Sequence, residues 1–204
     1  MVSPWHPASK LPGQHTAVLI GPGLADPDLP DEIKLLTRHL WRDSQFPVVV
    51  DASALDWVPL ECGPRNAIRV LTPHPAEAAR LLRYTTEQVQ SDRPQVLRQL
   101  SRRFGNAWVV LKGYQTLIGR STGELYVNSS GNPYLAQGGS GDLLAGYLAG
   151  LLAQPGLQAD ALKTIRYAVW QHGATADELQ NTRQAWTVEE LADELGRTRC
   201  ICET

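Results

Sequence analysis

The sequence is poor in cysteine, and this shortage bounds its chemistry. Only three cysteines occur among 204 residues. Cys62 stands alone, and Cys200-x-Cys202 lacks the second pair of ligands that a zinc site needs, so we interpret this pair as inert. An odd cysteine count without a secretion signal is typical of a reducing compartment, and we therefore expect a cytoplasmic protein.

Signals for a membrane or for nucleic acid are also missing. The first residues, MVSPWHPASKLPGQH, contain no apolar segment of the kind that a signal peptide needs. No run approaches the roughly 18 apolar residues of a membrane span. The net charge is −2, the pI is near 6.2, and no basic block stands out. We therefore expect neither nucleic acid nor a membrane as a partner.

What remains is the composition of a globular protein. Hydrophobic residues make up 43% of the chain and charged residues 20%, which is enough apolar material to bury a core. The length suits one domain. We expect a lead-in loop over residues 1–15, a single domain over residues 16–196 and a tail over residues 197–204.

The apolar residues alternate between strand-like and helix-like patterns. Four short apolar runs predict buried strands: Ala17–Ile20, Pro47–Val50, Ala67–Leu71 and Ala107–Leu111. Predicted helices lie between them: Asp28–Trp41, Ala76–Arg83 after Pro75, and Thr86–Phe104 with an interruption at Pro94. Buried strands that alternate with helices predict an α/β fold, with a mainly parallel central sheet and helices on both of its faces.

The pattern changes in the second half of the chain. Thr116–Gly119 and Glu124–Asn128 flank Ser121-Thr122-Gly123, which predicts an antiparallel hairpin toward one edge of the sheet. Asp160–Leu179 is predicted to be another helix, and one side of it carries Ala161, Ile165, Ala168, Val169 and His172. The capping box Thr187-x-x-Glu190 predicts the start of a last short helix.

The stretch Gly131–Gln154, GNPYLAQGGSGDLLAGYLAGLLAQ, carries the strongest chemical signal. A glycine-rich loop ends at Asp142 and leads into a helix with no polar face, which predicts burial on all sides. The start of such a helix attracts anions through its free N–H groups and its dipole. Asp142 is therefore either a base beside a transferring phosphoryl group or a plain N-cap. The closely spaced glycines favour approach by a ligand.

Distinctive residues also follow the predicted strands, where ligands bind in parallel sheets. Gly21-Pro22-Gly23 either lets a ligand approach the backbone or simply ends its strand. Asp51 contacts a ligand or metal, or caps the next turn. Lys112 could neutralise phosphate charge and Thr116 could donate a hydroxyl, or the lysine is incidental to a turn. The chain contains no P-loop and no G-x-G-x-x-G dinucleotide motif.

The segment after the third strand offers two more candidates. His74 lies between two prolines, so its imidazole is either presented in a fixed direction or is an ordinary exposed loop histidine. Glu77 either helps to hold magnesium through water or complements the dipole of the following helix.

Five motifs together carry a family resemblance: GPGL, VVVDASAL, LTPHPAEAARLL, VVLKGYQT and the glycine-rich stretch. In this collinear order, over residues 16–180, the chain resembles the ADP/ATP-dependent NAD(P)H-hydrate dehydratases, a nucleotide-repair branch of the ribokinase-like superfamily. The glycine-rich stretch is the most diagnostic motif. TPHPxE supports the resemblance, since sugar kinases of the superfamily more often carry asparagine where His74 stands.

The resemblance implies a ribokinase-like fold and a reaction. Asp142 would accept the proton of the hydroxyl on the hydrated nicotinamide ring, phosphate would then leave, and NADH or NADPH would be restored. ADP (or ATP) would be the co-substrate, with Mg²⁺. The implied substrate contacts are Gly23, His74 and Asp142. The implied adenine-nucleotide contacts are Lys112, Gly113, Tyr114, Gln115, Thr116 and Gly141.

The chain departs from the family pattern at its N-terminal side. Family members normally carry further strands and a substrate-contacting alanine region before the GPGL strand. GPGLA also replaces GPGLG, and Tyr134 and Gln137 stand where small residues are common. We therefore expect an exposed strand edge or apolar helix face, and a homo-oligomer that covers it. Two alternatives stay open: a small-molecule kinase of the same fold, and a non-catalytic remnant that still binds nucleotide.

Overall fold

A computed structural model describes residues 15–60, 63 and 66–197. Residues 1–14 of the predicted lead-in over residues 1–15, most of the predicted tail, and Cys62, Cys200 and Cys202 lie outside the described residues.

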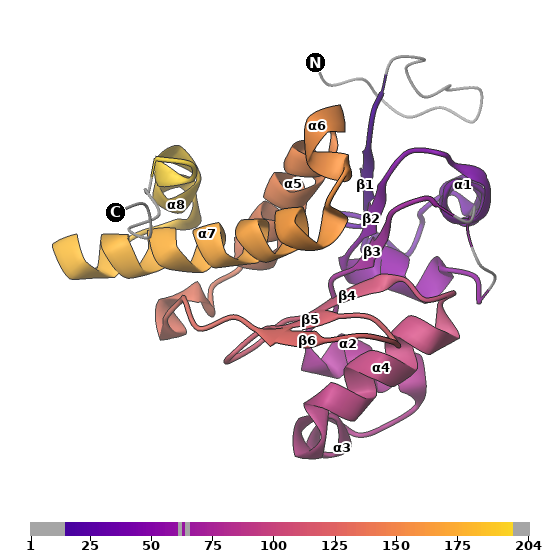
Figure 1. The fold of residues 1–204 in the computed structure, drawn as a ribbon, viewed down its shortest axis with the longest axis horizontal. Helices are drawn as coiled ribbons and strands as arrows, with labels where there is room; N and C mark the ends of the chain where they lie inside the picture. The colour runs from indigo at the N-terminus through magenta and orange to yellow at the C-terminus, as the bar shows by residue number, and fades with distance from the viewer. Residues whose placement is uncertain (1–14, 61–62, 64–65, 198–204) are drawn as a thin grey trace.

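One six-stranded sheet organises the chain, in the order β1-β2-β3-β4-β5-β6 (Figure 1). The first four strands are parallel, and β5 and β6 are antiparallel to their neighbours. Their bounds are Val18–Ile20, Val48–Val50, Arg69–Leu71, Trp108–Leu111, Leu117–Gly119 and Leu125–Val127. The predicted α/β class, the parallel sheet and the hairpin at one edge are confirmed.

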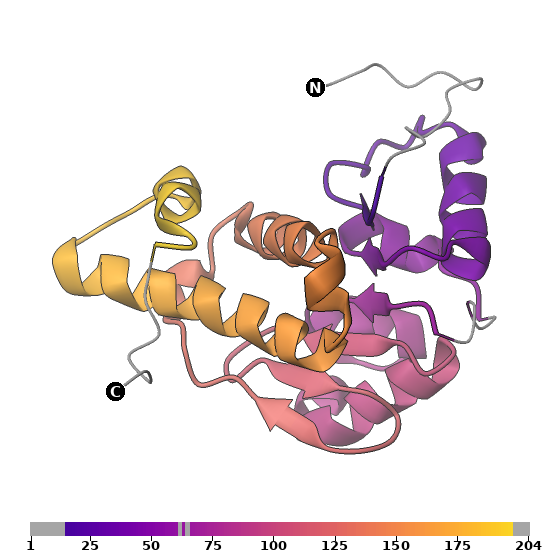
Figure 2. The same ribbon diagram turned by 45° about the horizontal axis from the view of Figure 1, so that its top comes forward.

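Helices cover both faces because the inner strands are apolar on both sides. Val48 and Val50 of β2 face one core, and Val49 faces the other. The first core is covered by α1 Asp31–Asp43, the 3₁₀ helix η1 Ala52–Trp57, α2 Pro75–Leu82, α3 Thr86–Ser91 and α4 Arg93–Arg103. The second is covered mainly by α5 Ser140–Leu152 and α7 Ala161–Thr182, with α6 Pro155–Gln158 between them (Figure 2).

The helix boundaries follow local capping chemistry. Pro75 occupies the first turn of α2, as predicted. The predicted helical region Thr86–Phe104 divides at Asp92, two residues before Pro94, because Asp92 caps α4 through the N–H of Gln95. The predicted capping box between Thr187 and Glu190 opens α8, Val188–Glu194.

Helix α5 is buried less completely than its composition predicts. Leu144, Leu148 and Leu152 are buried in the second core, but Gly146 and Gly150 are exposed. The prediction of burial on all sides is wrong. An apolar composition allows a helix to be buried, but burial also needs neighbouring elements on every side, and α8 packs over only part of α5. All three residues of β1, the edge strand next to α5, are likewise only half-buried.

None of the helices in the described ranges is long and apolar enough to cross a membrane.

Candidate functional site

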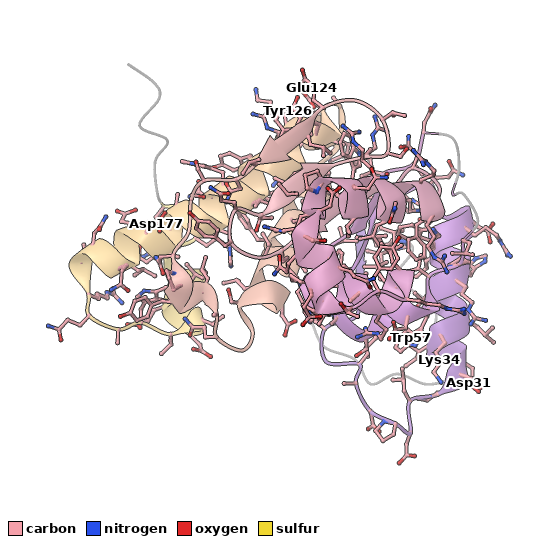
Figure 3. The ribbon with its side chains drawn as sticks, turned by 90° about the horizontal axis from the view of Figure 1, so that it is seen from below. Asp31, Lys34, Trp57, Glu124, Tyr126 and Asp177 are labelled. Carbon is pink, nitrogen blue, oxygen red and sulfur yellow. The ribbon has the colours of Figure 1, made fainter. Side chains whose placement is uncertain are left out.

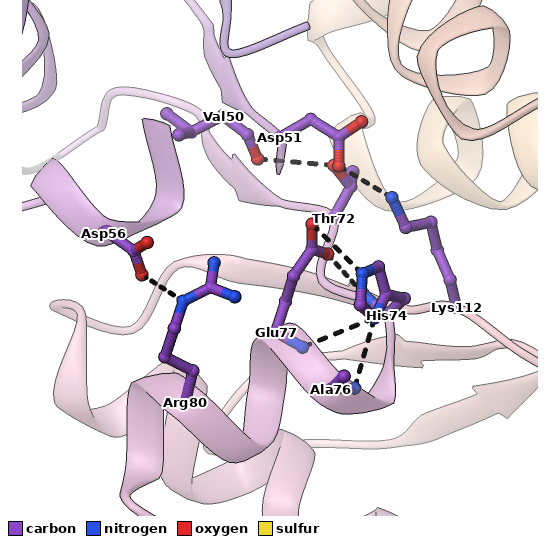
Figure 4. A network of polar contacts seen from close by, with 9 residues as sticks. All are labelled: Val50, Asp51, Asp56, Thr72, His74, Ala76, Glu77, Arg80 and Lys112. Carbon is purple, nitrogen blue, oxygen red and sulfur yellow. Dashed lines mark hydrogen bonds and ion pairs between the residues drawn. The ribbon is translucent and has the colours of Figure 1, made fainter. Parts of the chain in front are cut away.

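The ends of three parallel strands meet at one buried carboxylate. Asp51 follows β2 and is 1% exposed. Its Oδ1 accepts a hydrogen bond from Thr72 Oγ1 at 2.8 Å, after β3, and one from Lys112 Nζ at 2.7 Å, after β4 (Figure 4). Asp51 stands at the N-cap position of η1 but makes no side-chain cap hydrogen bond. Of the two roles left open for Asp51, capping is therefore wrong, and the carboxylate instead binds Lys112.

The Gly-Pro-Gly turn after β1 packs against the same residue. A Cβ at Gly21 would lie 1.7 Å from the backbone oxygen of Asp51, and Gly21 has φ +133°. Only glycine fits there. Gly23 also has a positive φ, but a Cβ on it would meet nothing within 4 Å. Gly21 thus packs the strand ends together, while Gly23 faces open space.

The start of α5 is an uncapped helix N-terminus. Gly139 is its N-cap residue, with φ +85°, and no side chain caps the helix. Asp142 is the third residue of the helix and is exposed. The interpretation of Asp142 as a plain N-cap is therefore wrong. Its carboxylate stands in the first turn with no hydrogen bond or ion pair to any described residue.

Lys112 brings the strand ends and this helix start together. A Cβ at Gly141 would lie 3.2 Å from Lys112 Nζ. The Lys112 side chain is only 17% exposed, so its ammonium group lies under the glycine loop. An ammonium group next to a helix N-terminus offers N–H donors and positive charge from two sides, which favours a phosphate group.

His172 on α7 is a buried neighbour of this site that the sequence prediction missed. It is 6% exposed and forms a hydrogen bond with the backbone of Ser140. Burial, with a smaller contribution from the charge of Lys112, lowers the pKa of His172 to about 4. Its Nε2 atom has no hydrogen-bond partner among the described residues. The helical spacing of α7 had placed His172 on an apolar face, where nothing marks it as part of a site.

His74 and Glu77 form a reciprocal capping box at the start of α2. His74 Nδ1 accepts from the N–H groups of Ala76 and Glu77, and Glu77 Oε2 accepts from the N–H of His74 at 2.7 Å (Figure 4). Glu77 is 6% exposed, and its other oxygen lies 3.4 Å from His74 Nε2. His74 is therefore a helix cap with a half-exposed ring, a role that neither predicted alternative included. The carboxylate of Glu77 is occupied by this capping box.

Arg93 fixes the backbone of the predicted nucleotide-binding segment Lys112–Thr116. This arginine donates to the carbonyl oxygens of Leu111 and Lys112 at 3.0 and 3.3 Å, and also to that of Tyr114. Burial lowers the pKa of Arg93. No motif in the sequence indicated this role.

The side chains of Lys112–Thr116 differ in their exposure to solvent and in whether their hydrogen-bonding groups are already used. Tyr114 is 87% exposed, and Gln115 is also exposed, with φ +54°. Thr116 Oγ1 donates to the carbonyl of Gly113 at 3.0 Å, so its hydroxyl is already used as a donor. The segment presents an aromatic ring and an amide to solvent above a fixed backbone.

The loop before α5 is anchored to α7. Asp177 on α7 accepts from the backbone N–H of Gly131 at 2.7 Å and from Asn132 Nδ2 at 3.1 Å; Figure 3 labels Asp177 on this helix. Ser130 Oγ donates to the carbonyl of Trp170 at 2.8 Å. These contacts fix where the glycine loop enters the site.

A groove of about 560 Å³ runs along the exposed face of α5. Asp142 lines one end, Gln154 the other, and Ala192 and Leu195 line the side formed by α8 and the residue after it. The floor includes Gly146 and Gly150. Asp142 is therefore open to solvent at this end of the groove.

No group of three or more metal-binding side chains occurs in the part of the chain that the structure describes. One of the two alternatives for Glu77 was that it helps to hold magnesium through water, but its carboxylate accepts a hydrogen bond from the backbone N–H of His74 and lies 3.4 Å from the ring of His74. The described residues therefore do not fit a magnesium ion held by the protein alone.

Comparisons with known proteins agree on one family. The family described as NAD(P)H-hydrate dehydratase matches residues 4–198. The ADP-dependent (S)-NAD(P)H-hydrate dehydratase of Neisseria meningitidis is 44% identical over 153 residues, which cover 72% of this chain and 49% of the relative. The Bacillus subtilis protein of the same name is 32% identical over 193 residues, which cover 93% of this chain and 66% of the relative. The chain thus spans about half the length of the Neisseria protein.

Solved structures show the same relationship. The Bacillus subtilis ADP/ATP-dependent NAD(P)H-hydrate dehydratase co-crystallized with ATP/Mg²⁺ superposes with a TM-score of 0.77 at 29% identity, and the match covers 94% of this chain and 66% of that one. A hydroxyethylthiazole kinase from Pyrococcus horikoshii has a TM-score of 0.66 at 17% identity, covering 91% of this chain and 72% of that one. The second match shows the fold alone.

Proposed function

Because this chain belongs to the NAD(P)H-hydrate dehydratase family, we propose that it converts hydrated NADH or NADPH back to the reduced nucleotide with ADP as phosphoryl donor. The observation that carries the proposal is the start of α5, where the free carboxylate of Asp142 stands beside an uncapped helix N-terminus and the ammonium group of Lys112. The names and chemistry of the relatives supply the substrate.

In the proposed reaction, Asp142 takes the proton of the ring hydroxyl, and the hydroxyl oxygen attacks the terminal phosphorus of ADP. The bond from that phosphorus to the bridging oxygen breaks, and AMP leaves. The carbon–oxygen bond of the new ester then breaks with release of phosphate, a ring proton is lost, and the carbon–carbon double bond is restored. Phosphoryl transfer mainly needs positioning and charge neutralisation, which the helix start and Lys112 can supply.

The other proposed contacts divide between two ligands. Gly23 and His74 bind the hydrated nucleotide together with Asp142, and this assignment is supported by the open space at Gly23 and the half-exposed ring of His74. Residues 112–116 and Gly141 bind ADP, supported by the exposed Tyr114 beside the anchored backbone. Magnesium enters as part of the nucleotide co-substrate, since the described residues do not fit it alone.

The exposed face of α5 favours one alternative function, namely that the protein binds nucleotide without turnover. Gly146, about one helical turn from Asp142, is exposed, and this leaves water access to the site. We also propose a homo-oligomer, in which a second copy covers this face and the half-buried strand β1, and a cytoplasmic location. Light scattering after gel filtration tests the oligomer; a single monomeric mass would contradict it.

The test of the proposed function is an absorbance assay. The purified chain with hydrated NADH, ADP and Mg²⁺ is expected to restore the absorbance of reduced nicotinamide, with the Bacillus subtilis enzyme as positive control. No recovery above the uncatalysed rate, combined with a thermal shift by ADP and AMP, would favour the binding-only alternative. A stable phosphorylated product would favour a kinase.

A further inference from the structure

Asp51 is a buried acid whose position at the site has no assigned role. We propose that Asp51 is a positioning residue, which fixes the ammonium group of Lys112 opposite the start of α5 where the phosphoryl group binds. The inference rests on the proposed function. It assigns to Asp51 a role at the phosphoryl site, in addition to the substrate and nucleotide contacts proposed above.

The position of Asp51 is set by the ends of its neighbouring strands. Gly21 lies against its backbone, where no other residue fits, and the Thr72 hydroxyl donates to Oδ1. Asp51 Oδ2 has no hydrogen-bond partner among the described residues. A buried carboxylate with an oxygen left unpaired is destabilising. The stability of the fold alone therefore does not explain why an acid occupies this position. The attraction between its negative charge and the ammonium group of Lys112 does explain it.

Lys112 needs this partner because its other neighbours repel it. The ammonium group lies 3.2 Å from the position that a Cβ on Gly141 would occupy, close to the positive end of α5. The 2.7 Å ion pair with Asp51 Oδ1 is the contact that holds it there. Without the carboxylate, the flexible lysine chain is expected to swing toward solvent.

An ammonium group uses one N–H to bind Asp51, and its remaining N–H donors have no acceptor among the described residues. These donors are available to the oxygens of a phosphoryl group at the start of α5. A fixed cation stabilises developing charge better than a mobile one, because it needs no reorganisation as the reaction proceeds. Asp51 therefore acts on the reaction through Lys112 and contacts neither substrate.

The decisive experiment is a double-mutant cycle with D51N, K112M and the combined variant, measured by kcat and by calorimetric Kd for ADP. D51N is expected to lower kcat on the order of 100-fold and to weaken ADP binding about fivefold. In the K112M background, D51N is expected to change either quantity less than about twofold. If D51N lowers kcat as much without Lys112 as with it, the proposal is wrong.

Two further variants complete the experiment: one is a second probe of the same positioning, and the other is a control. T72V removes a hydroxyl that holds Oδ1 while keeping the side-chain shape, so it reports on the same positioning if D51N does not fold. It is expected to lower kcat about fivefold, and again only when Lys112 is present. D56N is the matched control, since Asp56 pairs with Arg80 at the surface of the neighbouring helix η1 and is expected to leave kcat unchanged.

Failure of the proposed function is distinguishable from failure of this inference. If the wild-type chain binds ADP without turnover, the proposed function fails, and the same cycle in Kd still decides the role of Asp51. If the wild-type chain binds no ADP, no phosphoryl site exists and both proposals are overturned.

Discussion

Two helices begin at the same edge of the sheet, and their starts are built in opposite ways. The start of α2 is closed: His74 and Glu77 satisfy each other's backbone N–H groups in a capping box. The start of α5 is left open: Gly139 offers no side chain, and Asp142 makes no cap. A capped helix start is already satisfied, whereas an uncapped one beside a lysine can bind an anion. This difference is the reason why we propose the phosphoryl site at the start of α5 and not at the start of α2.

Replacing Asp142 is expected to have the largest effect on the open start. D142N keeps the shape but removes the base, so turnover is expected to fall roughly 1,000-fold while ADP binding changes little. Turnover and calorimetric Kd are the measurements. E32Q, a carboxylate-to-amide change on the exposed face of α1, is the control and is expected to have no effect. Turnover near the wild-type rate in D142N would show that the base is another group.

Acid is expected to destabilise the core beneath the open start. His172 has a folded pKa near 4, below its ordinary value of 6.5, so the unfolded chain binds the proton more tightly. This contribution to stability is complete above pH 6.5 and is lost as the pH falls toward 4, about 3 kcal/mol in total. Denaturant unfolding between pH 7 and pH 4 measures it. H172Q is expected to flatten this part of the pH dependence, and an unchanged slope in H172Q would contradict the assignment.

A methyl group at the open start tests its geometry. G141A places a Cβ 3.2 Å from Lys112 Nζ and is expected to lower turnover about tenfold, because the ammonium group must shift. G146A is the matched control on the same helix, where a Cβ meets nothing within 4 Å. G146A is expected to keep turnover and to add up to about 1 kcal/mol of helix stability. Equal losses of turnover in both variants would mean that helix α5 as a whole, rather than Lys112, is the sensitive element.

The closed start is expected to show the smallest effect. H74A removes the cap of α2 and is expected to cost about 1 kcal/mol in the free energy of unfolding, whereas H74N keeps a good cap and most of the stability. Because the proposed substrate contact needs the imidazole, both variants are expected to raise KM for the hydrated nucleotide. Thermal unfolding and KM separate the two roles. If H74N has a wild-type KM, His74 only caps the helix.

The two starts also show how far sequence reasoning reaches. The valine runs Pro47–Val50 and Ala107–Leu111 predicted inner strands, because strands covered on both faces are apolar throughout. The rule that ligands bind beyond strand ends then brought Asp51 and Lys112 to one place. Their ion pair joins residues 61 positions apart, and no local pattern predicts which side chains pair across strand ends.

The remaining differences have the same origin in tertiary contacts. His74 was interpreted as a presented or exposed imidazole, because the sequence alone did not show that its ring accepts the N–H groups of Ala76 and Glu77. His172 was hidden by the apolar spacing of its helix. The exposed face of α5 was missed because composition does not say what covers a helix. Each of these three features depends either on contacts with residues that are distant in sequence or on the geometry of side chains.

The most direct test of the phosphoryl site is the stoichiometry of the complete reaction. The purified chain, hydrated NADH, ADP and Mg²⁺ are incubated, and AMP, phosphate and NADH are quantified together. We predict one AMP and one phosphate for each NADH restored, with all three formed roughly 1,000-fold more slowly by D142N. Release of AMP without recovery of NADH, or formation of these products by D142N at a rate near that of the wild type, would contradict the assignment of the start of α5 as the site where Asp142 drives phosphoryl transfer.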